Sequence, residues 1–236
     1  MRTFPCLFLS LALLAGCTAG GIQRKDGVQS QRSYTLSNLA KSDVDMISEL
    51  TQREVLNGLK LLTLKLYRRN PQEYRKAGLD NADTAAARIF QHVGKGPRSP
   101  LAFIDWKAGL HQAFQASYAG DRVQALMEAL TAMILAAYEH KTEFYLTDEL
   151  DAQKLYNSAR NLEVAVWKLS NARLADGQKM LLTNSMDGEV QNLSFEREFG
   201  KLIAQQDLLA LIVEDRSRRT INRIMQNVAT FVFLPI

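Results

Sequence analysis

The residue with the most informative chemistry is Cys17, which closes the segment Leu14-Ala15-Gly16-Cys17. A cysteine thiolate is a nucleophile and can accept a covalent group. Arg2 places a positive charge at the start of the chain, and residues 7–14 form an apolar run. A charged start, a short apolar run and small residues before a cleavage point are typical of a secretory signal, which takes no part in the fold. A membrane-spanning helix needs about 20 apolar residues, more than this run supplies.

The same four residues resemble the lipobox of bacterial lipoproteins. The resemblance covers residues 1–18 and implies that Cys17 receives a thioether-linked diacylglycerol, that the chain is cleaved after Gly16, and that the new amino terminus is acylated. In that family an aspartate after the cysteine retains the protein in the inner membrane. Thr18 at this position favours the outer membrane, with the protein facing the periplasm. Several acyl chains anchor stably, since each buried methylene contributes about 0.8 kcal/mol. The alternative is an ordinary signal with an incidental cysteine.

The remaining chain, residues 17–236, is long enough for one or two domains with a sizeable core. Removal of Arg2 lowers the formal charge of +4 by one, and acidic and basic residues are mixed along the chain. No nucleic-acid-binding surface is therefore predicted. The two cysteines are Cys6, lost with the signal, and Cys17, which the resemblance assigns to lipid. We expect no disulfide, so that stability must come from apolar packing.

The three histidines, at positions 92, 111 and 140, show no spacing typical of a metal site. A di-iron bundle needs Glu-x-x-His pairs on several helices, and a zinc protease needs His-Glu-x-x-His. The closest cluster is Glu139, His140 and Glu143, in which His140 pairs better with Glu143 than with Glu139. We interpret this cluster as a polar helix end. No metal or cofactor is predicted.

The sequence also lacks the signatures of hydrolytic enzymes. Helical periplasmic transglycosylases usually carry a Glu-Ser pair at a helix end, and this sequence has none. Glycoside hydrolysis otherwise needs two placed carboxylates, and Glu149, Glu163 and Glu196 fit ordinary helix-surface positions. The G-x-S-x-G motif of serine hydrolases is missing as well. The prediction is a protein without catalytic residues.

Two clusters of cationic side chains are candidate contact sites for a partner. The first occupies residues 67–76, around a predicted helix–helix joint, and the second lies on the last predicted helix. Either could engage anionic lipid, peptidoglycan carboxylates or an acidic partner protein. The alternative is a solvated corner with its tyrosines packed inward. The candidate contact residues are Tyr67, Arg68, Arg69, Tyr74, Arg75, Lys76, Arg216, Arg218, Arg219 and Arg223.

Capping signals and apolar spacing predict one helix after another. Ser42 with Asp45 resembles a capping box that opens a helix to about Arg69. Asn70-Pro71 restarts the chain as a short helix, and Gly78 ends it. Further helices are predicted over residues 81–91, 99–118, 121–143, 147–172 and 194–233. Since no alternation typical of strands persists, the expected class is an all-α multi-helix bundle with a long C-terminal helix.

The domain plan follows from where this pattern begins. Residues 1–16 are the signal peptide, residues 17–41 a lipid-anchored flexible tether, and residues 42–236 an all-helical domain. A flexible tether of this length reaches roughly 25–30 Å. Within the domain, residues 173–193 contain two Asp-Gly turn signals and are predicted as a small hairpin or a helical fragment. The last helix is predicted as either straight or bent near residues 214–219.

Three hypotheses for function follow. The first is a non-enzymatic outer-membrane lipoprotein whose helical body binds another envelope component, either a protein or peptidoglycan. The second is a helical carrier of an apolar small molecule or lipid, suggested by helices that are apolar on two sides around Leu61 and Ala132. Cell-wall hydrolysis is a third and weaker alternative.

Overall fold

The structure is a computed structural model. It describes residues 22–23, 29–30, 35–186 and 188–232, and for residues 220–232 it describes only the helix backbone. The chain divides between Ala40 and Lys41 into two units. In the first, β1 (Ile22–Gln23) pairs antiparallel with β2 (Gln29–Ser30), and a 3-10 helix, η1, spans Leu36–Ala40. Cys17 and the rest of the predicted signal lie outside the described residues.

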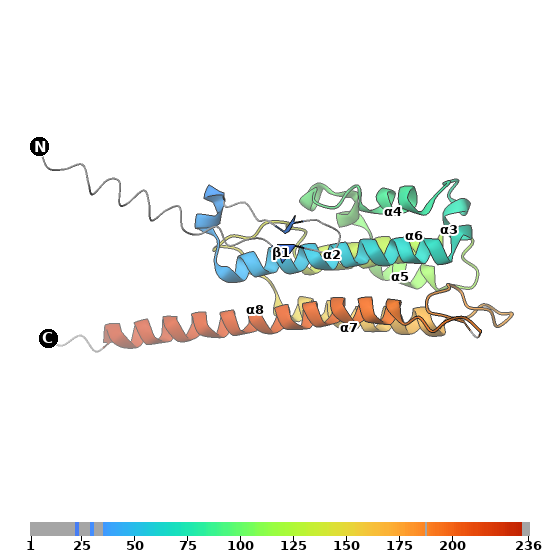
Figure 1. Ribbon diagram of the computed structural model, residues 1–236. Helices are drawn as coiled ribbons and strands as arrows, with labels where there is room; N and C mark the ends of the chain where they lie inside the picture. Colours follow the sequence, from blue (N-terminus) through green and yellow to red (C-terminus); the bar gives the residue numbers. More distant parts are fainter. Residues whose placement is uncertain (1–21, 24–28, 31–34, 187, 233–236) are drawn as a thin grey trace, which may run out of the picture. The chain divides into compact units, whose positions relative to one another are not determined.

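The second unit is built on four long helices: α2 (Asp43–Arg69), α6 (Arg122–Ala137), α7 (Ala152–Asn171) and α8 (Ser194–Val232). Figure 1 shows them lying side by side. Between α2 and α6 the chain forms α3 (Pro71–Lys76), α4 (Ala82–Phe90), η2 (Gly96–Arg98), η3 (Pro100–Phe103) and α5 (Trp106–Ala113). The prediction of an all-α bundle with a long C-terminal helix is confirmed.

Contacts between side chains show that neighbouring helices of the bundle run antiparallel. Arg216 of α8 pairs with Asp45 at the start of α2, whereas Phe195 of α8 lies under Lys65 near the end of α2. The pair Arg160–Asp207 and the hydrogen bond from Ser170 to Glu196 establish the same relation between α7 and α8. Each long helix therefore buries an apolar face against two neighbours.

The core consists of the apolar faces that the 3–4 spacing predicted. Helix α6 is buried on almost every side because α5 and η3 cover one face while α2 and α7 cover others. This packing accounts for its two-sided apolar pattern, including Ala132, whereas Leu61 of α2 is 45% exposed. Large buried side chains from the other helices include Val55, Leu59, Leu62, Leu66, Leu155, Leu162, Phe195, Phe199, Leu202 and Leu209.

Several helix starts agree with their capping signals. The Ser42 hydroxyl accepts a hydrogen bond from the Asp45 amide at 3.2 Å, and the Asp45 carboxylate accepts one from the Ser42 amide at 2.7 Å. Asn81 caps α4 by accepting from the Thr84 amide at 2.8 Å. Gly78, with a φ of 70°, follows α3. The left-handed conformation suits glycine because it has no Cβ.

The predicted helix over residues 99–118 is wrong in its continuity. Ser99 caps only the short η3, and Ile104 then adopts an extended conformation with ψ of 125°. Asp105 starts a new helix, α5, because its carboxylate accepts from the amides of Lys107 and Ala108. Phe103, the last residue of η3, is 81% exposed and therefore lies on no buried helix face.

Two other helix boundaries also differ from prediction. Helix α6 ends at Ala137 rather than near residue 143, because Glu139 and His140 both have positive φ values, of 53° and 55°. Helix α7 begins at Ala152 rather than near residue 147, because the Asp151 carboxylate accepts hydrogen bonds from the amides of Gln153 and Lys154.

Residues 173–193 form a loop that begins with a small hairpin, one of the two predicted alternatives. Arg173 and Lys179 form a single antiparallel bridge. The Leu174 amide donates to the Gln178 carbonyl at 2.8 Å, and Gly177, with φ of 83°, makes the turn.

Candidate functional site

The two tyrosines of the first cationic cluster are part of the core. Tyr67 and Tyr74 are buried, and their rings meet edge to face at 5.9 Å between centroids. The Tyr67 hydroxyl donates to Asp121 at 2.9 Å. Burial and the neighbouring carboxylate raise the pKa of Tyr67 well above its ordinary value. These tyrosines therefore stabilise the joint between α2 and α3, residues 67–76, which we call the corner, and they are not available to a partner.

Buried polar groups join this corner to the start of α6. One Glu73 oxygen accepts from the Arg122 amide at 2.7 Å and the other from the Lys76 ammonium at 2.8 Å. The Arg122 guanidinium donates to four backbone carbonyls between residues 113 and 118, which satisfies groups left free after α5. Burial raises the pKa of Asp121, although hydrogen bonds from the Gln124 amide and Tyr67 oppose this. Arg122 is not among the predicted contact residues, and its role here is structural.

The three arginines of the corner differ in their surroundings. Arg69 donates to both Glu189 oxygens, at 2.8 and 3.2 Å, and to the Asn184 carbonyl at 3.1 Å. This contact fastens the 173–193 loop to the end of α2 and, through the Arg69 hydrogen bonds, holds the pKa of Glu189 below its usual value. Arg68 is exposed and 3.7 Å from Asp83. Arg75 is also exposed, with its guanidinium 6.0 Å from the Tyr74 ring centroid.

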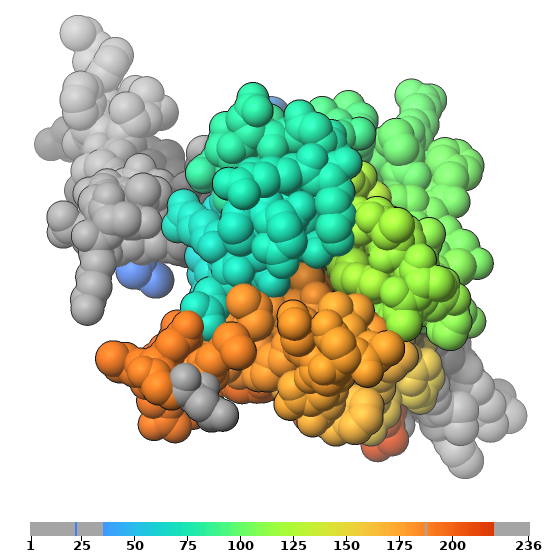
Figure 2. All heavy atoms as spheres, turned by 90° about the vertical axis from the view of Figure 1, so that its right-hand side faces the viewer, coloured from blue at the N-terminus to red at the C-terminus, as the bar shows by residue number. Residues whose placement is uncertain are grey.

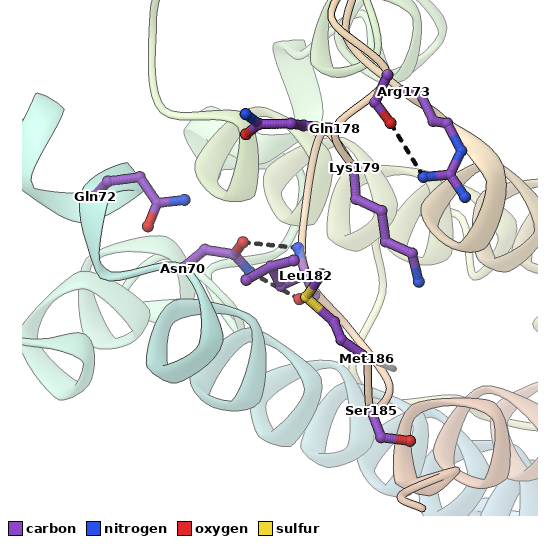
Figure 3. A pocket seen from close by; sticks show the side chains of 9 residues that line it. Asn70, Gln72, Arg173, Gln178, Lys179, Leu182, Ser185 and Met186 are labelled. Atoms are coloured by element: carbon purple, nitrogen blue, oxygen red, sulfur yellow. Dashed lines mark hydrogen bonds between the residues drawn. The ribbon is translucent and has the colours of Figure 1, made fainter. Parts of the chain in front are cut away.

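A hollow of about 580 Å³ lies between this corner and the loop, and we call it the corner hollow. Figure 2 views the end of the bundle where α3, in teal, meets the 173–193 loop, in orange. Asn70 forms its base: the side-chain amide donates to the Leu182 carbonyl at 2.9 Å and accepts from the Leu182 amide at 2.8 Å (Figure 3). The lining residues are Asn70, Gln72, Arg173, Gly177, Gln178, Lys179, Leu182, Ser185 and Met186.

The described residues that line the corner hollow carry a net positive charge. Arg173 and Lys179 are its two ionic lining residues, and no carboxylate is among the nine. Within the part of the chain that the structure describes, neither cation forms an ion pair; Arg173 donates only to the Gly177 carbonyl, at 3.2 Å. An anionic group could therefore be bound here without displacing an internal partner. These two cations are not among the predicted contact residues, although they flank the Asp176-Gly177 turn signal on either side.

The second cationic cluster, on α8, is largely paired with acidic residues. Arg216 donates to Asp45 at 2.6 Å. Arg218 pairs with Glu214, and Arg219 with Asp215 at 2.6 Å, both one helical turn away. The side chain of Arg223 lies outside the described side chains. The structure therefore does not bring the two predicted clusters together. Arg216 lies near the start of α2, whereas the first cluster, residues 67–76, lies at the end of α2 and in α3.

Among the described residues, acidic, cysteine and histidine side chains form no group of three or more that could hold a metal ion. No helix in the described part of the chain is both long and apolar enough to cross a membrane.

Comparison with known proteins does not assign the chain to a class. No protein-family model, curated protein or solved structure matches it significantly.

Proposed function

We propose that this protein is a non-enzymatic bacterial lipoprotein, anchored in the outer membrane by lipid on Cys17 and facing the periplasm. Its helical body binds an acidic surface of another envelope protein. The membrane placement is supported by the signal-like residues 1–16, by the Leu14-Ala15-Gly16-Cys17 segment and by Thr18. The binding role is supported by the corner hollow.

The observation that carries the binding role is a preformed hollow whose two cations form no ion pair with any described residue. The hydrogen bonds of Asn70 and Arg69 hold the loop in place, so the hollow does not depend on a partner for its shape. Preorganisation of this kind reduces the ordering that binding must otherwise supply. Arg173 and Lys179 would pair with carboxylates of the partner.

The lining also favours a protein over peptidoglycan as the partner. Leu182 and Met186 are apolar, and Met186 is 46% exposed. Methionine and arginine are enriched at the centres of protein interfaces, where apolar contact accompanies a few polar ones. Gln72 and Gln178 add exposed amide groups at the rim.

The alternatives have less support from the geometry. The carrier hypothesis rests on helices that are apolar on two sides around Leu61 of α2 and Ala132 of α6. Packing against α2, α5 and α7 accounts for the pattern of α6, and Leu61 is 45% exposed. Hydrolysis of the cell wall would need two placed carboxylates, and none of the described residues that line the corner hollow carries one.

Site-specific photocrosslinking in the bacterium tests the proposal. A photoreactive phenylalanine analogue is placed at position 178, in the rim of the corner hollow, and in a matched strain at position 60. Lys60 is an exposed cation on α2 outside the hollow. We expect one discrete heavier protein band from position 178 and none from position 60. Charge reversal of Lys179 to glutamate should remove that band.

The other outcomes contradict specific parts of the proposal. A product that disappears after digestion with a muramidase would identify peptidoglycan as the partner. The same band from both positions would show that contact is not specific to the corner hollow. The absence of any product from position 178, in protein present at normal levels, would exclude the corner hollow as a binding site.

A further inference from the structure

A second hollow, of about 630 Å³, lies between α5, α6 and α7, and we call it the tryptophan groove. Met133, Ala136 and Ala137 of α6 contribute apolar surface, and Trp106 at the start of α5 lines it too. Polar and charged groups complete the lining: Lys107, Glu139, His140, Lys154, Asn157, Ser158, Arg160 and Asn161. The volume lies in the range of small-molecule sites, roughly 300–1,000 Å³.

The backbone beside this groove has an unusual conformation. Glu139 and His140 are consecutive non-glycine residues in the left-handed region, with φ of 53° and 55°. This conformation is unfavourable for residues with a Cβ atom, and it persists where the surrounding structure or a function requires it. Here they turn the chain sharply after α6 and place His140 in the groove lining. The His140 Nδ1 atom is buried and has no hydrogen-bond partner among the described residues.

The charged residues of the tryptophan groove are not equivalent. Lys154 pairs with Glu139 at 2.6 Å, and Arg160 pairs with Asp207 at 2.6 Å. Lys107 has no ion pair within the described part of the chain, and its ammonium lies 5.4 Å from the centroid of the Trp106 ring. The groove therefore offers one available cation directly beside an aromatic surface.

We propose that the tryptophan groove binds a small aromatic carboxylate. The aromatic ring of the ligand packs against Trp106 and Ala136, which are both partly exposed in the groove, and its carboxylate pairs with the Lys107 ammonium. Aromatic contact in a half-buried groove provides affinity, and the charge-assisted hydrogen bond fixes the orientation. This site is separate from the corner hollow and does not depend on the function proposed above.

Nuclear magnetic resonance of the two tryptophan indole N–H groups provides a direct test. The chain has two tryptophans, and Trp167 lines no part of the groove, so its signal serves as an internal control. A Trp167→Phe variant assigns the signals. Titration of the body, residues 41–236, with 1-naphthylacetate should shift the Trp106 signal saturably and leave that of Trp167 unchanged. This segment is a compact unit on its own.

Two lysine variants test the role assigned to Lys107. Lys107→Met should weaken binding of 1-naphthylacetate about tenfold. Lys168→Met is the matched control, because Lys168 also lies over an aromatic ring, 5.6 Å from Phe114, but does not line the groove. It should leave the affinity unchanged.

Two results would overturn the proposal. One is a Trp106 signal that stays fixed, or moves only in parallel with that of Trp167, up to the solubility limit of the ligand. The other is equal affinity for 1-naphthylacetate and its uncharged methyl ester, which would remove the carboxylate from the recognition.

Discussion

A Cβ atom built on Gly58 of α2 would lie 2.5 Å from the Leu202 Cδ2 atom of α8. Gly58 thus allows the two antiparallel helices to approach closely in the middle of the bundle. Leu202 is 2% exposed, so its side chain has little room to rotate away. The close approach is a packing requirement that helix propensity alone would not favour.

Gly58→Ala should therefore destabilise the body by about 1–2 kcal/mol, because overpacking outweighs the gain in helix propensity. Gly200→Ala in α8 is the control, since nothing lies within 4 Å of its added Cβ. It should stabilise the body by up to about 1 kcal/mol. Urea unfolding followed by circular dichroism measures both. Equal stabilisation by the two variants would show that Leu202 repacks freely.

Tyr138→Phe should cost about 1–3 kcal/mol of unfolding free energy. The Tyr138 hydroxyl donates to Gln206 Oε1 at 2.7 Å, and Gln206 Nε2 donates to Ser158 Oγ at 2.8 Å, all inside the core. Removal of the hydroxyl leaves the Gln206 oxygen buried without a donor. Tyr145→Phe, which removes an exposed hydrogen bond to Glu143, should change stability by less than about 0.5 kcal/mol. Thermal unfolding of the two variants distinguishes them.

Stability should fall on acidification partly through Asp45. Burial alone would raise the pKa of Asp45, but hydrogen bonds from Ser42 and from Arg216 outweigh it and place the pKa below its ordinary value. The contribution is thus present above the unfolded-state pKa and is lost as the pH falls through the folded-state pKa. Asp45→Asn should lower stability at pH 7 and flatten the stability profile below about pH 4.

Denaturant unfolding at a series of pH values measures this profile. Asp43→Asn, which removes an exposed carboxyl from the same helix turn, controls for the effect of charge at the start of α2. If the unfolding free energy of Asp45→Asn falls on acidification as steeply as that of the parent and of Asp43→Asn, the Asp45–Arg216 contact does not contribute to the acid sensitivity.

Arg69→Glu should loosen the 173–193 loop, because it removes the hydrogen bonds to Glu189 and the Asn184 carbonyl and adds a like charge. Hydrogen exchange of the loop amides should rise several-fold, while global stability falls by only about 1 kcal/mol, as expected for a partly exposed ion pair. Arg68→Glu alters the neighbouring exposed cation and should leave loop exchange as in the parent. Equal exchange in both variants would argue against Arg69 as the anchor.

Cys17→Ser tests the proposed lipid anchor. Labelled palmitate should enter the parent chain and not the variant, and the variant should appear uncleaved or released from the membrane. The helical content of the body should remain unchanged, because the compact unit begins at Lys41. Label entering the Cys17→Ser chain, or parent chain that is cleaved elsewhere without label, would contradict the lipoprotein proposal.

Local signals in the sequence predicted those features that neighbouring residues control. The Ser42–Asp45 capping box, the Asn81 cap and the Gly78 turn each depend on groups within three or four positions of each other, so their chemistry is visible in the chain itself. The apolar spacing likewise predicted the bundle and its long last helix, because burial of one helix face requires that spacing.

The predictions of helix boundaries and caps were wrong where a contact between residues distant in the chain competes with a local preference. The residues near 143 and 147 carry helix signals of their own, but the Phe144 amide donates to Glu49 of α2 at 3.0 Å, and its ring packs 6.1 Å from Tyr138. Asn70 looks like a cap in the sequence, yet its amide binds Leu182, more than a hundred positions away. Such pairings depend on which helices meet, which apolar spacing does not encode.

The all-α class, most helix starts and the expectation of a lipid-bearing cysteine can be predicted from the chain, because each depends on residues close together in it. Which cations have partners depends on how the helices pack. This packing buries Tyr67 and Tyr74, pairs Arg69 and Arg216 with distant carboxylates, and leaves Arg173 and Lys179 around a hollow. The availability of a charge depends on the acids that folding brings near it, and their positions in the chain do not reveal this.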